Sequence, residues 1–127
     1  MKRTLWIGLP IALAILAVGF YQAMYVAPME ATMGNIQRIF YYHVPSNIMG
    51  LLFPYVNFVA SVVFLATRRS NPLRAQAADA LALASAEMTL VFVSIGLATG
   101  MLWGKPMWGT WWTWDARLTC CLVLWLI

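Results

Sequence analysis

Long apolar stretches are the feature of this sequence that most limits its fold. A membrane-spanning helix needs about 20 mostly apolar residues to cross roughly 30 Å of hydrocarbon. Three stretches reach that length, at about Leu5–Val26, Asn47–Thr67 and Ala80–Trp103, while Leu118–Ile127 is apolar but too short to cross. The sequence therefore predicts an all-α integral membrane protein with three full transmembrane helices and the start of a fourth. We expect a single domain over residues 1–127 that is incomplete at its C-terminus.

The composition agrees with a membrane protein and excludes several function classes. Hydrophobic residues make up 63% of the chain and charged residues 9%, whereas a soluble domain has about 45–50% and about 25%. The basic residues are scattered over loops, so the chain lacks the clustered basic face that nucleic-acid binding requires. Cys120 and Cys121 are adjacent, which gives neither a disulfide framework nor a metal-ligand spacing. We expect no nucleic-acid partner.

The basic residues in the short loops predict the orientation, because the side of the membrane with more Lys and Arg stays cytoplasmic. The expected inner side carries five such residues and the outer side three, which are Lys2, Arg3, Arg68, Arg69 and Arg74 inside, and Arg38, Lys105 and Arg117 outside. The first apolar stretch is longer than the h-region of a signal peptide, so we expect it to be retained as a helix. The N-terminus is then cytoplasmic, and His43 and most tryptophans share the outer face.

Five of the seven tryptophans lie in one short outer segment, from Trp103 to Arg117. Gly104, Pro106 and Gly109 predict that the helix leaving the third span breaks within this segment. If the segment is helical, Trp108, Trp111 and Trp112 share a face; if it is extended, Trp108, Trp112 and Trp114 do. Three interpretations remain open: an interfacial tryptophan belt, a surface for a partner protein, and an aromatic platform for a flat ligand such as a porphyrin.

A porphyrin would need further groups that the outer loops contain. Arg38, Lys105 and Arg117 are candidates for its propionates, and His43 is the only histidine available to its iron. The residue types alone also permit blander roles: a loop-carbonyl hydrogen bond for His43, a plain loop charge for Lys105 and an interface anchor for Arg117. Pro45 predicts that His43 ends a short surface helix just before the second span.

Four other positions carry structural expectations. Asp115 is placed to cap the fourth helix, where an acidic group at the N-terminus is favoured. Gly96 and Gly100 form a small-xxx-small pair, which predicts a close helix neighbour. Glu87 lies inside the third span, where a charge is costly. We expect Glu87 to form a hydrogen bond within the bundle, through Ser85, Thr89 or Asn57, or, alternatively, to contact another subunit.

Two separated motifs resemble a known family. Residues 108–119, WGTWWTWDARLT, resemble the tryptophan-rich signature of the haem-handling proteins of cytochrome c biogenesis. Residues 38–45, RIFYYHVP, and 103–106, WGKP, look like the corresponding segments of the haem exporter C family. Larger haem lyases share the tryptophan signature, but in them it lies deeper in a longer chain. A haem lyase fragment and a non-haem transport subunit with a tryptophan belt remain the alternatives.

The resemblance implies a six-helix protein of the bacterial inner membrane that holds haem on its periplasmic face. It implies His43 as an axial ligand of the haem iron, with a second histidine beyond Ile127. Trp108, Trp111, Trp112 and Trp114 are then the platform, Arg38, Lys105 and Arg117 the propionate contacts, and Gly109 and Asp115 structural residues of the motif. The haem is b-type, non-covalent and transient. The implied partners are a membrane-anchored haem chaperone, ATP-binding-cassette exporter subunits and the lipid bilayer, and no catalytic residue is implied.

Overall fold

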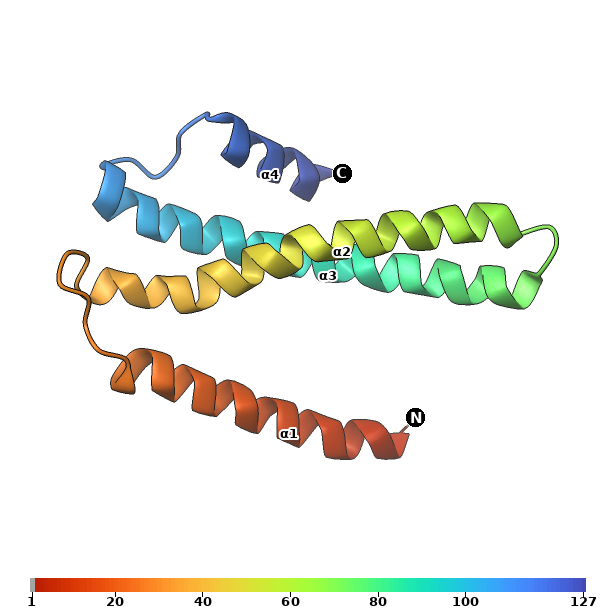
Figure 1. Ribbon diagram of the computed structural model, residues 1–127, viewed down its shortest axis with the longest axis horizontal. Coiled ribbons are helices and arrows are strands. Elements are labelled where there is room, and N and C mark those ends of the chain that lie inside the picture. Colours follow the sequence, from red (N-terminus) through yellow and green to blue (C-terminus); the bar gives the residue numbers. More distant parts are fainter. Residues whose placement is uncertain (1) are drawn as a thin grey trace. The chain divides into compact units, whose positions relative to one another are not determined.

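The computed structural model describes the backbone of residues 2–127 and the side chains of residues 6–127. Over these residues the chain is helical, with short turns between the helices (Figure 1). The elements in chain order are α1 (Lys2–Tyr21), the π-helical turn η1 (Gln22–Val26), the 3-10 turn η2 (Asn35–Ile39), α2 (Phe40–Thr67), α3 (Pro72–Trp108) and α4 (Ala116–Leu126).

Three segments are long and apolar enough to cross a membrane, namely Trp6–Val26, Asn35–Thr67 and Pro72–Trp108. The fourth helix, α4, has 11 residues, which rise only about 16 Å. The predicted fold class, an all-α membrane protein with three spanning helices and a short fourth, is confirmed.

The second helix begins earlier than the apolar pattern indicates. It begins at Phe40, seven residues before Asn47, and continues through His43 and Pro45 to Thr67. The prediction that Pro45 ends a short surface helix at His43 is therefore wrong. A proline removes one backbone hydrogen bond, and helices in membranes tolerate this because neighbouring groups satisfy the freed carbonyl.

The third helix is longer than its apolar core at both ends. It begins at Pro72, where the side chain of Asn71 accepts a hydrogen bond from the Arg74 amide and proline occupies the first helical position. It then runs through Gly104 and Pro106 to Trp108, so the predicted break at these two residues is wrong. Gly109 alone ends the helix, in the left-handed conformation with φ 77°, which glycine adopts without steric cost.

The chain divides into two compact units, one up to Tyr41 and one from Tyr42 to Ile127. In the first unit α1 runs directly into η1, and the loop after η1 closes by a hydrogen bond from the Gly34 amide to the Glu30 carbonyl, 3.0 Å long. In the second unit α2 and α3 run antiparallel and cross each other, and α4 folds back beside α3 (Figure 1).

Small residues allow α2 and α3 to approach closely. A Cβ atom at Gly96 would lie 2.5 Å from Oδ1 of Asn47, and one at Gly100 would lie 3.1 Å from Cε1 of His43. The close neighbour predicted for the Gly96 and Gly100 pair is therefore α2. The other buried residues of these two helices are also small or of medium size: Ser46, Gly50, Ala60, Ala75, Ala78, Ser85, Thr89, Val93 and Gly104.

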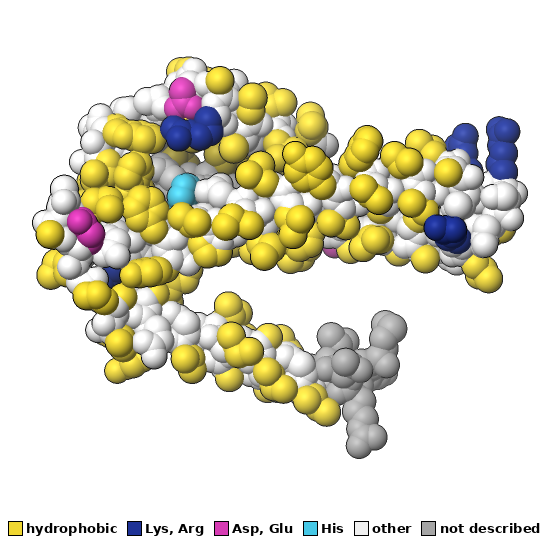
Figure 2. All heavy atoms as spheres, viewed as in Figure 1, with side chains coloured by type: hydrophobic (Ala, Val, Ile, Leu, Met, Phe, Trp, Pro, Cys, Tyr) yellow, Lys and Arg dark blue, Asp and Glu magenta, His cyan; other side chains and the backbone are white. Residues whose placement is uncertain are grey.

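The outer faces of the helices are hydrophobic (Figure 2), as expected for surfaces that contact lipid or other membrane helices. Basic side chains gather where α2 and α3 join (Figure 2), at Arg68, Arg69 and Arg74. The 37 residues of α3 extend about 55 Å at 1.5 Å per residue, well beyond the roughly 30 Å of the hydrocarbon layer.

Glu87 does not have the internal hydrogen bond that we expected, among the residues whose side chains the structure describes. Its side chain is exposed, and the expected partners bind backbone carbonyls instead. The Asn57 amide donates to the Ala82 carbonyl, and Ser85 and Thr89 donate to carbonyls one turn back on α3. Hydroxyl side chains in helices often bond in this way. Contact of Glu87 with another subunit stays a prediction.

Candidate functional site

We define the tryptophan segment as residues 108–114. Its first residue, Trp108, is the last residue of α3, and the others form a non-helical loop that leads to α4. Its fold depends on the turn at Gly109. The Gly109 carbonyl accepts a 3.0 Å hydrogen bond from Nζ of Lys105. Thr110 closes the next turn by donating from Oγ1 to the Trp112 carbonyl, also 3.0 Å. A Cβ atom at Gly104 would lie 3.4 Å from the Trp108 ring and 3.6 Å from the Thr110 carbonyl. Gly104 therefore gives the segment room to fold back against α3.

The tryptophans of this segment do not form one continuous face. Trp108 packs edge-to-face on Trp103, with ring centroids 5.0 Å apart, and Trp112 packs edge-to-face on Trp114 at 5.7 Å. Trp111 is 54% exposed. Of the two arrangements predicted from sequence, only the pairing of Trp112 with Trp114 from the extended one is present, because Trp108 belongs to α3 while the residues after it are in a loop.

Each of the two outer cations in this region lies over an indole ring. Nζ of Lys105 is 5.9 Å from the ring centroid of Trp111, and Cζ of Arg117 is 5.9 Å from that of Trp108. Both distances lie within the range of cation–π attraction. The expectation that Lys105 is a plain loop charge is too simple, since its ammonium contacts both the backbone and an indole.

Asp115 holds the end of the segment. Its Oδ1 accepts a 3.0 Å hydrogen bond from the Leu118 amide, and its Oδ2 accepts a 2.8 Å bond from the Thr113 hydroxyl. Oδ2 also lies 3.7 Å from the Arg117 guanidinium. The Leu118 amide and the Thr113 hydroxyl lower the pKa of Asp115 below its usual value, because they stabilise the charged carboxylate. Asp115 is the N-cap of α4, as its place in the sequence predicts.

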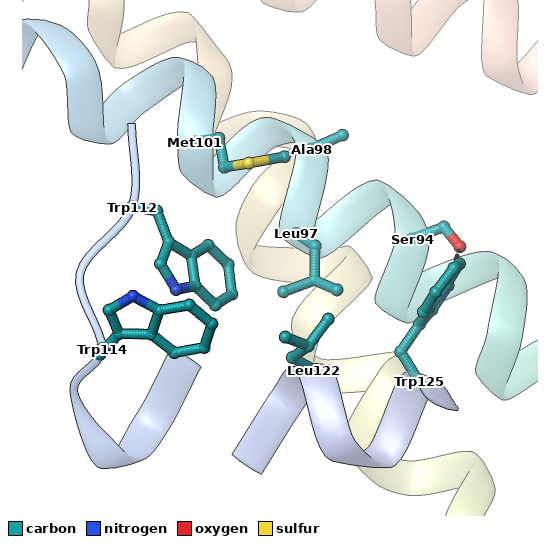
Figure 3. Close-up of a pocket in the computed structure, with 8 residues that line it drawn as sticks. All are labelled: Ser94, Leu97, Ala98, Met101, Trp112, Trp114, Leu122 and Trp125. Carbon is teal, nitrogen blue, oxygen red and sulfur yellow. Dashed lines mark hydrogen bonds between the residues drawn. The ribbon is translucent and has the colours of Figure 1, made fainter. Parts of the chain in front are cut away.

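An apolar cavity of about 470 Å³ lies between α3, α4 and the tryptophan segment (Figure 3). This volume falls within the usual range for small-molecule sites. Trp112 and Trp114 close one end, and at the other end Nε1 of Trp125 donates a 2.7 Å hydrogen bond to Oγ of Ser94. The walls between these ends are the aliphatic and thioether side chains of Leu97, Ala98, Met101 and Leu122 (Figure 3).

One polar atom in the cavity wall is unsatisfied. Nε1 of Trp112 is buried and has no hydrogen-bond partner among the residues that the structure describes. A buried indole N–H normally finds an acceptor. Because this N–H has no surface open to the cavity, the walls that a ligand meets are apolar.

His43 lies in α2 and is half-buried against α3. Its Nδ1 is 3.0 Å from Oγ1 of Thr99, and its Nε2 is 3.0 Å from Nδ2 of Asn47. The imidazole therefore contacts two side chains and not the loop carbonyl that was the alternative from sequence. Among residues 6–127, no group of three or more His, Cys, Asp or Glu side chains is able to hold a metal ion.

His43 and the cavity lie on different faces of α3. Thr99 and Gly100 face His43, whereas Ala98 and Met101 line the cavity. Successive helical residues are rotated by about 100°, which separates these two sets. Arg117 interacts with residues of both regions: its guanidinium lies over the Trp108 ring and is also within electrostatic range of His43. Arg38 lies in η2, in the unit that ends at Tyr41, and its role in propionate binding stays a prediction.

The family described as Heme exporter protein C matches residues 1–127. The chain belongs to this family. It is 41% identical over 113 residues to "Heme exporter protein C" of Bradyrhizobium diazoefficiens, an alignment that covers 89% of this chain and 40% of the relative. It is 39% identical over 119 residues to the protein of the same name in Escherichia coli strain K12, with coverage of 94% and 46%. The chain thus spans less than half the length of these relatives.

In this member of the Heme exporter protein C family, sequence reasoning missed Asn47 and Thr99, the two side chains that contact His43. Asn47 follows His43 by one helical turn, a spacing that permits contact. Thr99 is 56 residues away in the sequence, and only the Gly96 and Gly100 pair pointed to a helix approaching there. Met101, Leu122 and Trp125 were also missed, because apolar residues in a span give no signal that distinguishes a cavity wall from a lipid-facing surface.

Proposed function

We propose that this chain binds haem and takes part in haem export for the biogenesis of c-type cytochromes. The observation that carries the proposal is the apolar cavity closed at one end by Trp112 and Trp114. Haem is flat and apolar apart from two propionates at one edge. Its faces suit indole rings and aliphatic walls. Membership of the Heme exporter protein C family supports the same conclusion.

The proposal gives each outer residue a role. Trp108, Trp111, Trp112 and Trp114 are the platform residues for the macrocycle, and His43 supplies an axial nitrogen to the iron. Because His43 and the cavity lie on different faces of α3, a haem that uses both requires the tryptophan segment and α3 to rearrange when it binds. Lys105 and Arg117, with Arg38, pair with the propionates. Lys105 and Arg117 already lie over indole rings, so a propionate that binds either cation also lies beside the platform. Gly109 and Asp115 hold the loop that carries these residues.

The haem is bound without a covalent bond, as a b-type group, and only transiently. Stacking, one axial bond and a few charge pairs hold it reversibly, which a transfer protein requires. The protein acts as a carrier and not as a catalyst: it presents haem on the periplasmic face of the bacterial inner membrane and delivers it to a membrane-anchored haem chaperone. Subunits of an ATP-binding-cassette exporter are the other partners, and the N-terminus is cytoplasmic.

The haem content of purified variants tests this function. Trp112 and Trp114 are replaced together by alanine, and the matched control is Trp6→Ala, which removes an indole of α1 that is 79% exposed. We expect the double variant to lose most of the haem that the unmodified chain retains after reconstitution, measured by Soret absorbance per mole of protein. The Trp6 variant should retain it.

If the double variant and the control have equal haem content and both chains insert normally into membranes, the tryptophans form an interfacial belt and not a haem platform. Haem that resists extraction by acidic organic solvent would instead show a covalent bond to this chain and would contradict the b-type, non-covalent binding proposed here.

A further inference from the structure

The contacts around His43 assign its protons. The hydroxyl of Thr99 reaches two carbonyls of its own helix, that of Ile95 at 2.6 Å and that of Gly96 at 3.2 Å, so its single proton is used within α3. Towards Nδ1 of His43, Oγ1 of Thr99 therefore acts as an acceptor, and Nδ1 carries a proton that it donates across 3.0 Å. In a neutral imidazole the other nitrogen, Nε2, then has the free lone pair.

The contact on the other side of the ring agrees with this assignment. Nδ2 of Asn47 donates one hydrogen to the His43 carbonyl, 3.0 Å away. Its second hydrogen points to Nε2, also 3.0 Å away. An amide nitrogen only donates, so Nε2 accepts. Two independent side chains thus select the same tautomer, and Asn47 covers the lone pair that a metal would use.

We propose that Thr99 is a positioning residue for axial ligation by His43 and that Asn47 caps Nε2 until haem arrives. The inference rests on the proposed haem function. On binding, a bond forms between iron and Nε2 while the hydrogen bond from Asn47 to Nε2 breaks. The proton on Nδ1 stays in place, so no proton or electron leaves the site.

The two residues act on binding in opposite directions. An acceptor on the far nitrogen fixes the tautomer and orientation of a ligating histidine and raises its basicity, and loss of such an acceptor typically weakens metal affinity about 10–100-fold. A donor on the ligating nitrogen competes with the metal. Removal of one neutral hydrogen bond changes an equilibrium by roughly two- to tenfold, so the Asn47 cap lowers affinity by that factor and makes release easier.

The first experiment needs no haem. His43 is the only histidine among the 127 residues, so ¹⁵N NMR of the histidine-labelled chain in micelles reports its tautomer directly. We expect the unmodified chain to show a protonated Nδ1 and an unprotonated Nε2. Thr99→Val should redistribute the proton between the two nitrogens, and Thr99→Ser should restore it. Thr89→Val is the matched control, because Thr89 lies on the same helix and bonds the Ser85 carbonyl without contact to His43.

The second experiment titrates iron protoporphyrin IX into the same variants, with His43→Ala as the reference that lacks the axial nitrogen. We expect Thr99→Val to weaken the imidazole-ligated form about 10–100-fold, while Thr99→Ser and Thr89→Val bind as the unmodified chain does. Asn47→Ala should bind roughly two- to tenfold more tightly and should also increase the rate at which diethyl pyrocarbonate acylates His43.

The outcomes separate this inference from the proposed function. A tautomer that Thr99→Val does not change, or an Asn47→Ala variant with slower acylation of His43 and weaker binding, overturns the positioning roles even if the chain binds haem. If the spectra of the unmodified chain and His43→Ala are the same, His43 is not an axial ligand. The proposed positioning role then fails together with that part of the function, whatever the tautomer.

Discussion

Gly96 and Gly100 determine at the residue scale how closely His43 and Asn47 approach α3. Each glycine faces one of these side chains, and neither position has space for a further carbon atom without movement of its neighbour. Small residues have this function in many membrane helix pairs. Here they also let the imidazole come within hydrogen-bond distance of Thr99.

We expect Gly96→Ala to destabilise the pair of helices. The added Cβ would lie 2.5 Å from Oδ1 of Asn47, and overpacking of this kind costs about 1–3 kcal/mol. Gly19→Ala is the matched control, because nothing lies within 4 Å of a Cβ at that position of α1. The free energy of unfolding, measured by denaturant titration in mixed micelles, should fall for the first variant only. Equal stabilities would mean that α2 and α3 are not held by this contact.

The sequence reveals some residues of the site and not others for a physical reason. Five tryptophans in one segment can be recognised from the sequence because they are clustered, and the histidine can be recognised because it is the only one. The partners of that histidine are an ordinary threonine and asparagine, whose importance depends on where two distant helix faces meet. The pairing of Trp112 with Trp114, and of Trp108 with Trp103, likewise depends on where α3 ends.

At the scale of single elements, α4 depends on its N-cap. Its first turn has no other acidic residue, and Asp115 satisfies the amide of Leu118. We expect Asp115→Ala to fray this turn and Asp115→Asn to preserve it, since asparagine caps helices as well as aspartate does. Hydrogen exchange of the amides of residues 118–121, followed by NMR, should be faster in the alanine variant only. Unchanged exchange there would contradict the capping role.

The same cap should depend on pH. Hydrogen bonds from the Leu118 amide and the Thr113 hydroxyl lower the pKa of Asp115 in the folded chain. Its contribution to stability is therefore complete above the pKa of the unfolded chain and is lost as the pH falls through the lowered value, below about pH 4. Exchange of the same amides should accelerate in that acid range. In the asparagine variant the exchange rate, corrected for its intrinsic pH dependence, should stay flat.

The limits of sequence reasoning about elements are clear at the prolines and at the caps. Apolar length located all three spanning helices, because the cost of unsatisfied backbone in lipid leaves few alternatives. The same cost keeps Pro45 and Pro106 inside helices, where rules from soluble proteins predict an end. The Asn71–Pro72 start of α3 has a recognisable capping signal, which was overlooked because it precedes the apolar stretch.

For the molecule as a whole, the distribution of basic residues predicts which side of the membrane each loop occupies. In a chain with Cys120 and Cys121 replaced by serine, single cysteines are introduced at Met29, which is 64% exposed, and at Ser70. An impermeant thiol reagent added to the periplasmic side should label the first and not the second. After membrane disruption both should react. The reverse pattern would place His43 and the tryptophan segment on the cytoplasmic side.

The length of α3 has a consequence for where this protein is able to work. Because the helix exceeds the hydrocarbon layer by about 25 Å, a thicker bilayer covers more of the same rigid rod and a thinner one covers less. Neither change needs to stretch or unwind the helix, since its first two turns carry Arg74 and Gln76 and its last two turns carry Trp103, Lys105 and Trp108. Bilayers that differ by several ångströms in thickness are therefore equivalent hosts for α3, and mismatch should not sort the protein among lipid regions of one membrane.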